Sequence, residues 1–507
     1  MMNHINHKRR SLTKAALGLS ALQIVGAASP ALLSFAANTS ASAATAGSRF
    51  AELFEPLQRK YSARWIERGK KYTETVNRYH AAMDKRQTEI EAGKKPPEIP
   101  EPKDDPRKGI AKEVLRVAKL VLPTASVAEI AQWRAAFPFG YDAFIKAYAD
   151  DSCSVEQCFA LDSSDYAIII KNFNGHKFSL GVKRGNEWKF DPSIHCVGRS
   201  HHRKTWAFAN ANDIETRDGF DGKKIHAFAY PRGNEGLPAW LKLGPTKEAQ
   251  RADVIVPFID GKRVLLANET GVYLLDATAS KATEKVKRLH PQEFNKEGPY
   301  TWGKNKDESD SALSLSMVHV ALSPDEKYIA LGEQDSSHML LNVQGKVIAT
   351  ADVGNYPHYA LFDRTSKHVL FNECHFYSGI TSVVALSQVA PTHTGKPIEL
   401  KKKPVDEVLR VYSATAGQNS FYLGGSGYMN CVDVEGKNLW RHHIGGSVKD
   451  IDLMNEERQL LVASYSGLLV CYELREGQSD PMRIGDSPLW DAERWLFLND
   501  MKLPVPC

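Results

Sequence analysis

Five polar residues stand near the starts of repeated β-rich units in the second half of the chain: His319, His358, Arg410, Asp450 and Asp452. Histidine nitrogens bind metal ions and exchange protons near neutral pH, so His319 and His358, in consecutive units, could form a metal site or an acid–base pair. The alternative, which is the commoner role of a histidine on a strand, is that they hydrogen-bond the neighbouring strands. If the units surround a common axis, their first strands lie closest to it, and we predict a binding site at one end of that axis.

Other candidate ligands occur in short clusters. His195-Cys196 and His201-His202 place four possible metal ligands within eight residues, in a stretch that otherwise resembles an exposed loop. Cys374-His375 and His442-His443 have no evident partners, and neighbouring residues on a strand point to opposite faces. The sequence contains no zinc-type Cys-x-x-Cys spacing, haem-attachment motif or phosphate-binding glycine loop. We therefore assign no catalytic residue, and the cofactor and the metal content stay open.

The seven cysteines are scattered along the chain. Cys153 and Cys158 could close a small disulfide loop in an oxidising compartment, because four intervening residues permit the geometry. Cys431 and Cys471 lie in apolar strand patterns and are expected to be buried thiols. The odd number leaves at least one free thiol, for which Cys507 is the natural candidate.

The N-terminus has the pattern of an export signal. Arg9 and Arg10 precede an acid-free, mildly apolar stretch at 15–35, and small residues at 41–44 predict cleavage after Ala43. The segment Arg-Arg-Ser-Leu-Thr-Lys resembles a bacterial twin-arginine signal, although an ordinary secretory signal with a chance arginine pair is the alternative. We expect a periplasmic or secreted bacterial protein, with residues 1–43 as the signal peptide.

Composition limits the partners of the mature chain. The loss of four basic residues with the signal lowers the formal charge from +5 to +1, which does not favour nucleic-acid binding. No apolar run after Phe35 approaches the ~20 residues that cross a bilayer. The 42% hydrophobic and 25% charged residues are typical of a globular protein. Since the charge does not favour nucleic acid, we expect a protein partner or an envelope ligand.

Residues 44–150 are predicted to be helical. Apolar residues recur at helical spacing from Phe50 to Met83, and a proline-rich linker follows at 93–107. A second helix is expected around 110–121. Ser126 and Glu129 have the spacing of a capping box and predict the start of a third.

The chain changes to short β-branched and aromatic runs separated by polar turns after Cys153. These runs recur as a strand–turn–strand unit at intervals of about 40–65 residues, which is the spacing of four-stranded propeller blades. We predict seven units within 151–480 and a C-terminal tail at 481–507. The units begin near Cys158, Thr205, Asp253, Val318, Pro357, Leu409 and Val448.

Two segments resemble known repeats. Residues 323–330, Ser-Pro-Asp-Glu-Lys-Tyr-Ile-Ala, are similar to a turn of WD-repeat proteins, and residues 427–440 resemble the quinoprotein-type repeat, with a weaker copy at 466–474. With the repeat interval, the resemblance predicts a mainly β, seven-bladed propeller that follows the helical segment, with ligands at a channel mouth. Because no catalytic signature accompanies the repeats, we expect a binding or scaffold protein. The alternative is a quinoprotein-like oxidoreductase subunit or a lactonase-type enzyme.

Overall fold

The computed structural model describes residues 40–507 except 140, 163, 239–240, 242–250, 294–312, 314, 377, 476 and 479. The predicted signal residues Arg9 and Arg10 lie outside the described residues. The chain divides into two compact units, Met1–Thr45 and Ala46–Cys507. The long helix α1 (Ser40–Glu91) begins in the first unit, and everything that follows concerns the second.

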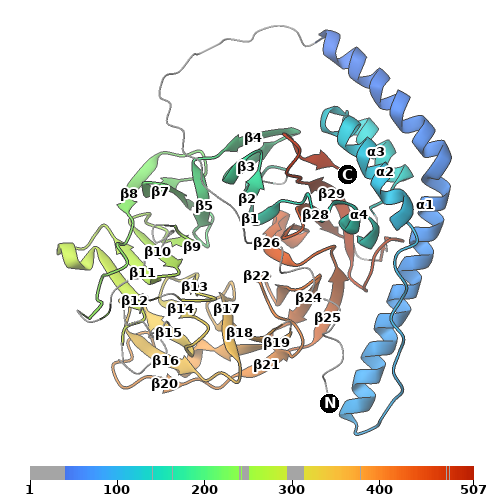
Figure 1. Cartoon of the computed structure of the whole chain (residues 1–507). Helices are drawn as coiled ribbons and strands as arrows, with labels where there is room; N and C mark the ends of the chain where they lie inside the picture. Colours follow the sequence, from blue (N-terminus) through green and yellow to red (C-terminus); the bar gives the residue numbers. More distant parts are fainter. Residues whose placement is uncertain are drawn as a thin grey trace, which may run out of the picture. The chain divides into compact units, whose positions relative to one another are not determined.

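Seven sheets follow one another along the described part of the chain, antiparallel except where β20 pairs in parallel with β16 (Figure 1). The first two consist of β1 (Ser154–Ala160), β2 (Tyr166–Phe173), β3 (His176–Arg184), β4 (Glu187–Asp191), and of β5 (Ile194–Arg199), β6 (Thr205–Asn210), β7 (Asp213–Asp218), β8 (Lys224–Ala229). The third comprises β9 (Val254–Pro257), β10 (Arg263–Asn268), β11 (Gly271–Asp276) and β12 (Val286–His290). The fourth comprises β13 (His319–Leu322), β14 (Tyr328–Gly332), β15 (His338–Asn342), β16 (Val347–Ala351) and β20 (Ile398–Glu399).

The last three sheets complete the set. They consist of β17 (Tyr356–Phe362), β18 (His368–His375), β19 (Ser378–Ala385) and β21 (Lys403–Asp406); of β22 (Ser413–Ala416), β23 (Ser420–Gly424), β24 (Tyr428–Asp433) and β25 (Asn438–His443); and of β26 (Val448–Met454), β27 (Gln459–Ser464), β28 (Leu468–Leu474), β29 (Leu489–Leu496) and β30 (Val505–Pro506).

The sheets form a ring with the first strand of each innermost. Contacts join β5 to β9, β13 to β17 and β22 to β26, and the ring closes where β1 meets β26 (Figure 1). The first strands of neighbouring sheets lie close together. A Cβ at Gly198 of β5 would lie 1.9 Å from the carbonyl oxygen of Ile255 on β9, which only glycine avoids. The predicted mainly β, seven-bladed propeller is confirmed.

Two predicted boundaries differ from the structure. The second sheet begins at Ile194, so that Thr205 starts its second strand. Residues 481–507 are no tail, because they contain β29 and β30, the outermost strands of the seventh sheet. The charged residues of β29 interrupt the apolar alternation by which sequence reasoning finds strands. Two of them, Asp491 and Arg494, pair with each other, and Asp491 also pairs with Arg134 of the helical segment.

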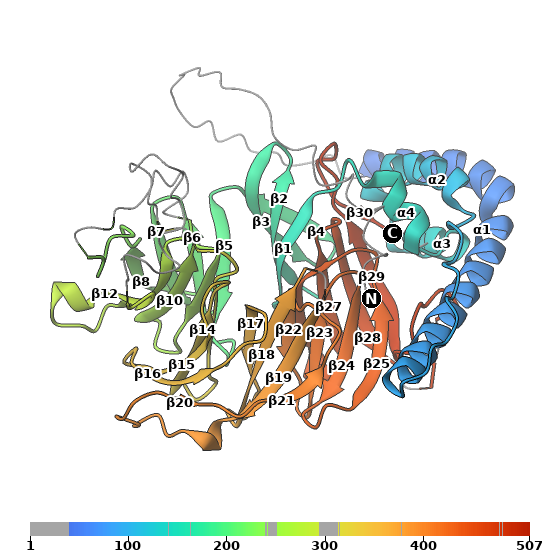
Figure 2. The same ribbon diagram turned by 60° about the horizontal axis from the view of Figure 1, so that its bottom comes forward.

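The helical segment consists of α1, α2 (Lys108–Val121), the 3-10 turn η1 (Leu122–Thr124), α3 (Val127–Ala136) and α4 (Tyr141–Tyr148). The predicted capping box is confirmed, since Ser126 and Glu129 cap each other's backbone at the start of α3. Helices α2–α4 lie beside β29 and β30 (Figure 2). All four helices share one hydrophobic core with the sixth and seventh sheets, which includes Trp65 of α1, Phe137, Tyr472 and Leu496.

The predicted disulfide between Cys153 and Cys158 is wrong, because both thiols are free and buried. Cys158 lies on β1 and Cys153 just before it. At about 3.3 Å per residue, their Cα atoms lie roughly 16 Å apart, far beyond the roughly 7 Å limit for a disulfide. The Cys153 thiol instead contacts the Asn172 carbonyl oxygen at 3.1 Å. No described helix is long and apolar enough to cross a membrane.

Candidate functional site

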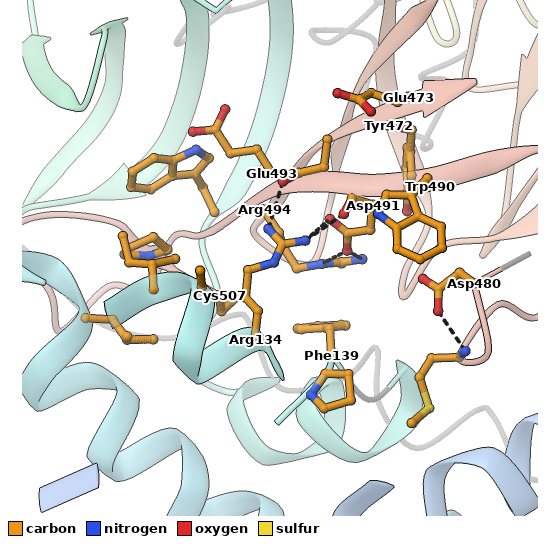
Figure 3. Close-up of a pocket in the computed structure, with 18 of the residues that line it drawn as sticks. Arg134, Phe139, Tyr472, Glu473, Asp480, Trp490, Asp491, Glu493, Arg494 and Cys507 are labelled. Carbon is orange, nitrogen blue, oxygen red and sulfur yellow. Dashed lines mark hydrogen bonds and ion pairs between the residues drawn. The ribbon is translucent and has the colours of Figure 1, made fainter. Parts of the chain in front are cut away.

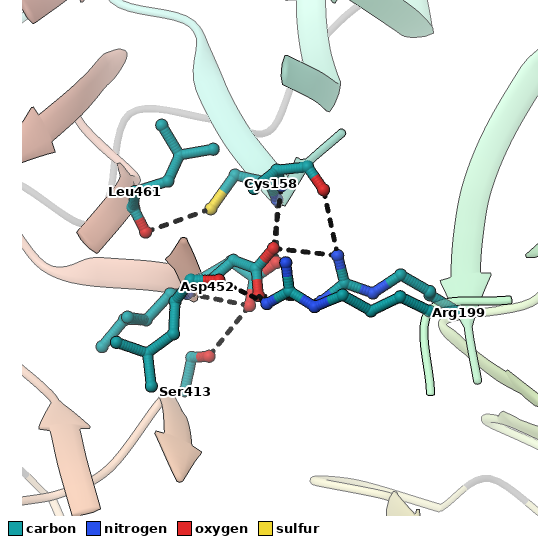
Figure 4. A network of polar contacts seen from close by, with 10 residues as sticks. Cys158, Arg199, Ser413, Asp452 and Leu461 are labelled. Carbon is teal, nitrogen blue, oxygen red and sulfur yellow. Dashed lines mark hydrogen bonds and ion pairs between the residues drawn. The ribbon is translucent and has the colours of Figure 1, made fainter. Parts of the chain in front are cut away.

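Asp450 and Asp452 lie on β26, where the ring closes against β1. Figure 4 shows Asp452 beside Cys158 and Arg199. Asp450 Oδ2 accepts a 2.8 Å hydrogen bond from the backbone N–H of Cys158, and Asp452 Oδ2 accepts one of the same length from Ala160. Both donors belong to β1 and both acceptors to β26, so the carboxylates satisfy edge N–H groups of the first sheet. The Ser413 hydroxyl on β22 donates to Asp450 Oδ1 at 2.9 Å.

Arginines from the second sheet complete this network. Arg199 donates to both carboxylate oxygens of Asp452, at 2.8 and 3.0 Å, and Arg203 adds a contact of 3.1 Å. Burial acts to raise the pKa of Asp452, but the two guanidinium groups hold it below its ordinary value. Burial raises the pKa of Asp450 to about 6 against the effect of its hydrogen bonds. These two predicted binding residues connect four sheets.

His319 is turned into the fourth sheet. Its Nδ1 lies 2.9 Å from the Met317 carbonyl oxygen and its Nε2 lies 3.2 Å from Nδ1 of His338, whose Nε2 is 3.1 Å from the Asn372 carbonyl oxygen. Burial lowers the pKa of His319 to about 4, and its side chain is nearly inaccessible. Each imidazole is thus hydrogen-bonded to neighbouring backbone or side chains, which agrees with the hydrogen-bonding alternative for His319 and His358.

His358 and Arg410 do lie together. The Nε2 atom of His358 is 3.1 Å from Arg410 Nη2, and its Nδ1 is 2.6 Å from the Val411 carbonyl oxygen. Burial first, and then Arg410, lowers the pKa of His358 to about 3, so the ring is neutral. Nδ1–H then donates to the carbonyl and Nε2 accepts from the guanidinium. Arg410 Nη1 also donates to the Phe376 carbonyl oxygen at 2.6 Å, which fixes the guanidinium in place.

Exposed apolar side chains surround Arg410. We use the term mouth patch for Tyr356, Phe376, Val408, Arg410, Tyr412 and Tyr465. Phe376 is 69% exposed and Val408 53%, although both are apolar. The Arg410 guanidinium lies 5.0 Å from the Tyr412 ring, which is 5.9 Å from the ring of Tyr465. The patch residues belong to the fifth, sixth and seventh sheets and to the segments that flank their strands.

Sequence reasoning found Arg410 and missed its neighbours. Phe376 lies at the turn between β18 and β19, where polar turn residues are usual, and an aromatic residue at such a tip was the available signal. The contacts of Tyr356 and Tyr465 with this region depend on the ring arrangement. Strand patterns along the chain do not predict them.

The other ligand clusters do not assemble. The Cys196 thiol contacts the Asp253 carbonyl oxygen at 3.7 Å, and His202 lies 3.1 Å from the Pro324 carbonyl oxygen. His442 lies 2.8 Å from the Ser487 hydroxyl. In the described ranges, no group of three or more His, Cys, Asp or Glu side chains is placed to hold a metal ion.

A second candidate site lies on the outer side of the seventh sheet. A cavity of about 1060 Å³, which we call the lateral cavity, separates α3 and η1 from β28 and β29. Figure 3 shows Arg134 of α3 and Asp491 and Arg494 of β29 pointing toward one another in it. No sequence pattern indicated this cavity, because its walls come from segments more than 300 residues apart, as in the pair Arg134 and Asp491.

Comparison of the sequence with protein-family models and with curated proteins found no match. Residues 323–330 and 427–440, which resemble known repeats, are turn and strand residues of the propeller. Function is therefore inferred from the geometry of the mouth patch and of the lateral cavity.

Proposed function

We propose that this is an exported binding protein whose mouth patch captures an acidic segment of a protein partner. The observation that carries the proposal is Arg410 within a rim of exposed aromatic and aliphatic side chains. No carboxylate in the described part of the chain forms an ion pair with this guanidinium. Tyrosine, phenylalanine and arginine are the residues enriched at the centres of protein interfaces.

The position of Arg410 favours recognition over a structural role. Its contacts with the His358 ring and the Phe376 carbonyl oxygen orient the guanidinium without neutralising it. An incoming carboxylate therefore finds a preoriented cation, and little side-chain entropy is lost on binding. Phe376 and Val408 flank it with apolar surface that a partner would remove from water. None of the described arrangements specifically favours the oxidoreductase or lactonase alternative.

Site-specific photo-crosslinking in the producing cell tests this function. A photoreactive phenylalanine analogue at Phe376 or Tyr465 should give one discrete adduct. The matched control is Ile259, an exposed apolar residue of the third sheet outside the patch. Arg410→Glu should abolish the adduct at Tyr465, because it replaces the attracting charge with a repelling one.

Two outcomes would overturn the proposal. The same adduct at Ile259 would show that capture does not depend on the patch. An unchanged adduct in the Arg410→Glu variant, with an unchanged melting temperature, would show that the partner segment is not acidic.

Export is the second part of the proposal and is supported by the N-terminal pattern. Replacing Arg9 and Arg10 with lysine keeps the charge but removes the guanidinium pair, so the precursor should accumulate in the cytoplasm. Lys8→Arg is the control, since it leaves the pair intact. Normal processing of the double lysine variant would favour the general secretory route instead.

A further inference from the structure

The lateral cavity has a buried, positively charged floor. Asp491 accepts from Arg134 Nη2 at 2.9 Å and from Arg494 Nη2 and Nε at 2.6 and 2.8 Å. Two guanidinium groups thus share one carboxylate. Burial acts to raise the pKa of Asp491, but both arginines lower it, so the carboxylate is ionised and the trio keeps one net positive charge.

A third arginine adds to this charge. Arg483 lies in the loop that follows Asp480 and donates through Nη1 to the Ser487 carbonyl oxygen. Arg483 and Arg494 both act on the buried imidazole of His442, whose pKa is lowered to about 3, first by burial. His442 is therefore neutral and does not alter the balance.

Glu473 and Glu493 also line the cavity, but Glu473 pairs with Arg475 and Glu493 with Lys183. Burial raises the pKa of Asp480, a further carboxyl of the lining, which makes it easier to protonate.

Two nitrogen donors of this region are left without acceptors. Arg494 Nη1 and Arg483 Nε are buried and make no hydrogen bond with any described residue. Arg494 as a whole is 6% exposed. A buried donor without an acceptor destabilises the protein, and native proteins rarely leave one without a reason. Both orphan groups are donors on cations, and an anion with acceptor oxygens would satisfy the hydrogen bonds and the charge together.

Apolar and aromatic surface adjoins the charged floor. The Phe139 ring covers Arg494, with 3.9 Å between its centroid and the guanidinium carbon. Trp490, Leu489 and Met482 also line the cavity. Figure 3 shows Trp490 and Asp480 next to the Arg134–Asp491–Arg494 cluster. A ligand that uses both surfaces must combine an anionic group with an apolar body, and about 1060 Å³ accommodates a ligand of drug-like size.

We propose that the lateral cavity is a binding site for a small amphipathic carboxylate. Its carboxylate accepts hydrogen bonds from Arg494 and Arg483, and its apolar body lies against Trp490. This site is separate from the mouth patch, and the proposal does not depend on the partner proposed there.

Calorimetric titration of the full chain with 2-naphthoate, and with uncharged 2-naphthamide, tests the assignment. Naphthoate should bind one per chain and raise the melting temperature, and naphthamide should bind at least tenfold more weakly, because a hydrogen bond to a charged group contributes about 1.5–3 kcal/mol. Arg483→Gln should weaken naphthoate about tenfold and leave naphthamide unchanged. Trp490→Ala should weaken both.

Arg458→Gln is the matched control, since this arginine lies on the seventh sheet but does not line the cavity. Arg483→Gln is preferred to a change at Arg494, which would also release Asp491 and could prevent folding. Equal affinity for the acid and the amide, unchanged naphthoate affinity in Arg483→Gln, or no binding at millimolar concentrations would each overturn the proposal. In that case the arginines would only connect α3 to β29 through Asp491 and would bind no ligand.

Discussion

The seventh sheet meets the rest of the protein along two different borders. Its inner strand β26 contacts the first sheet through Asp450 and Asp452, whose oxygens all have donors. Its outer strand β29 contacts the helical segment through an apolar core and through arginines that keep unused donors. A polar network with every group satisfied fixes a structure, whereas one with unused donors leaves a place for a ligand. Perturbed pKa values occur at both borders, so they do not by themselves distinguish the two cases.

Removal of the outer border should have the largest effect. A chain that stops after Asp480 lacks β29 and β30, so Leu468, Val470 and Tyr472 lose the strand that covers them. We expect insoluble protein, measured as the soluble fraction after expression. A chain that begins at Ala46 is the control and should remain soluble. Soluble, cooperatively unfolding 46–480 would show that β29 is dispensable.

Loss of one carboxylate at the inner border should have the second-largest effect on stability. Asp452→Ala leaves Arg199, whose side chain is 13% exposed, without its bidentate partner. An uncompensated buried charge should lower the free energy of unfolding by about 3–5 kcal/mol in urea titrations. Glu435→Ala breaks the exposed pair with Lys403 and should cost less than about 1 kcal/mol. Equal losses in the two variants would contradict a special role for ring closure.

Truncation of a buried leucine at the outer border should lower the free energy of unfolding by a smaller amount. Leu57 of α1 is buried in the shared core, so Leu57→Ala should lower the free energy of unfolding by about 2–4 kcal/mol. Leu120 of α2 is 40% exposed, and Leu120→Ala should change it by less than about 0.5 kcal/mol. Because the core is shared, a single unfolding transition is expected. A separate early transition in Leu57→Ala alone would show that the helices unfold independently.

The smallest effect is a pH dependence at Asp450. Its pKa is about 6 in the folded protein against an ordinary value of 3.8, so the folded state binds the additional proton between those values. The stability that this proton contributes is present below about pH 4 and is lost as the pH rises through 6, at most about 3 kcal/mol. Asp450→Asn should flatten unfolding free energies measured from pH 4 to 7. Asp221→Asn, at an exposed carboxylate, should not.

The sequence predicted the fold better than the sites, for physical reasons. Strand alternation and turn residues are local, and they suffice for seven sheets and the capping box of Ser126 and Glu129. They fail at β29, where Asp491 and Arg494 stand in place of apolar residues and form ion pairs with each other and with Arg134 of α3. His319 and Asp452 were correctly placed on first strands. The direction of their side chains depends on neighbouring sheets, which no local pattern encodes.

The closure of the ring also sets an order of events during synthesis. Cys158 and Asp450 are 292 residues apart, so β1 is complete long before β26 exists. At ribosomal rates of about 5–20 residues per second, Asp450 and Asp452 are synthesised roughly 15–60 s after Cys158 and Ala160, whose N–H groups have no carboxylate acceptor until then. During that interval the nascent chain carries an open β-edge that can pair with other chains. Two aspartates near the end of translation therefore remove an aggregation risk that exists from the first sheet onward.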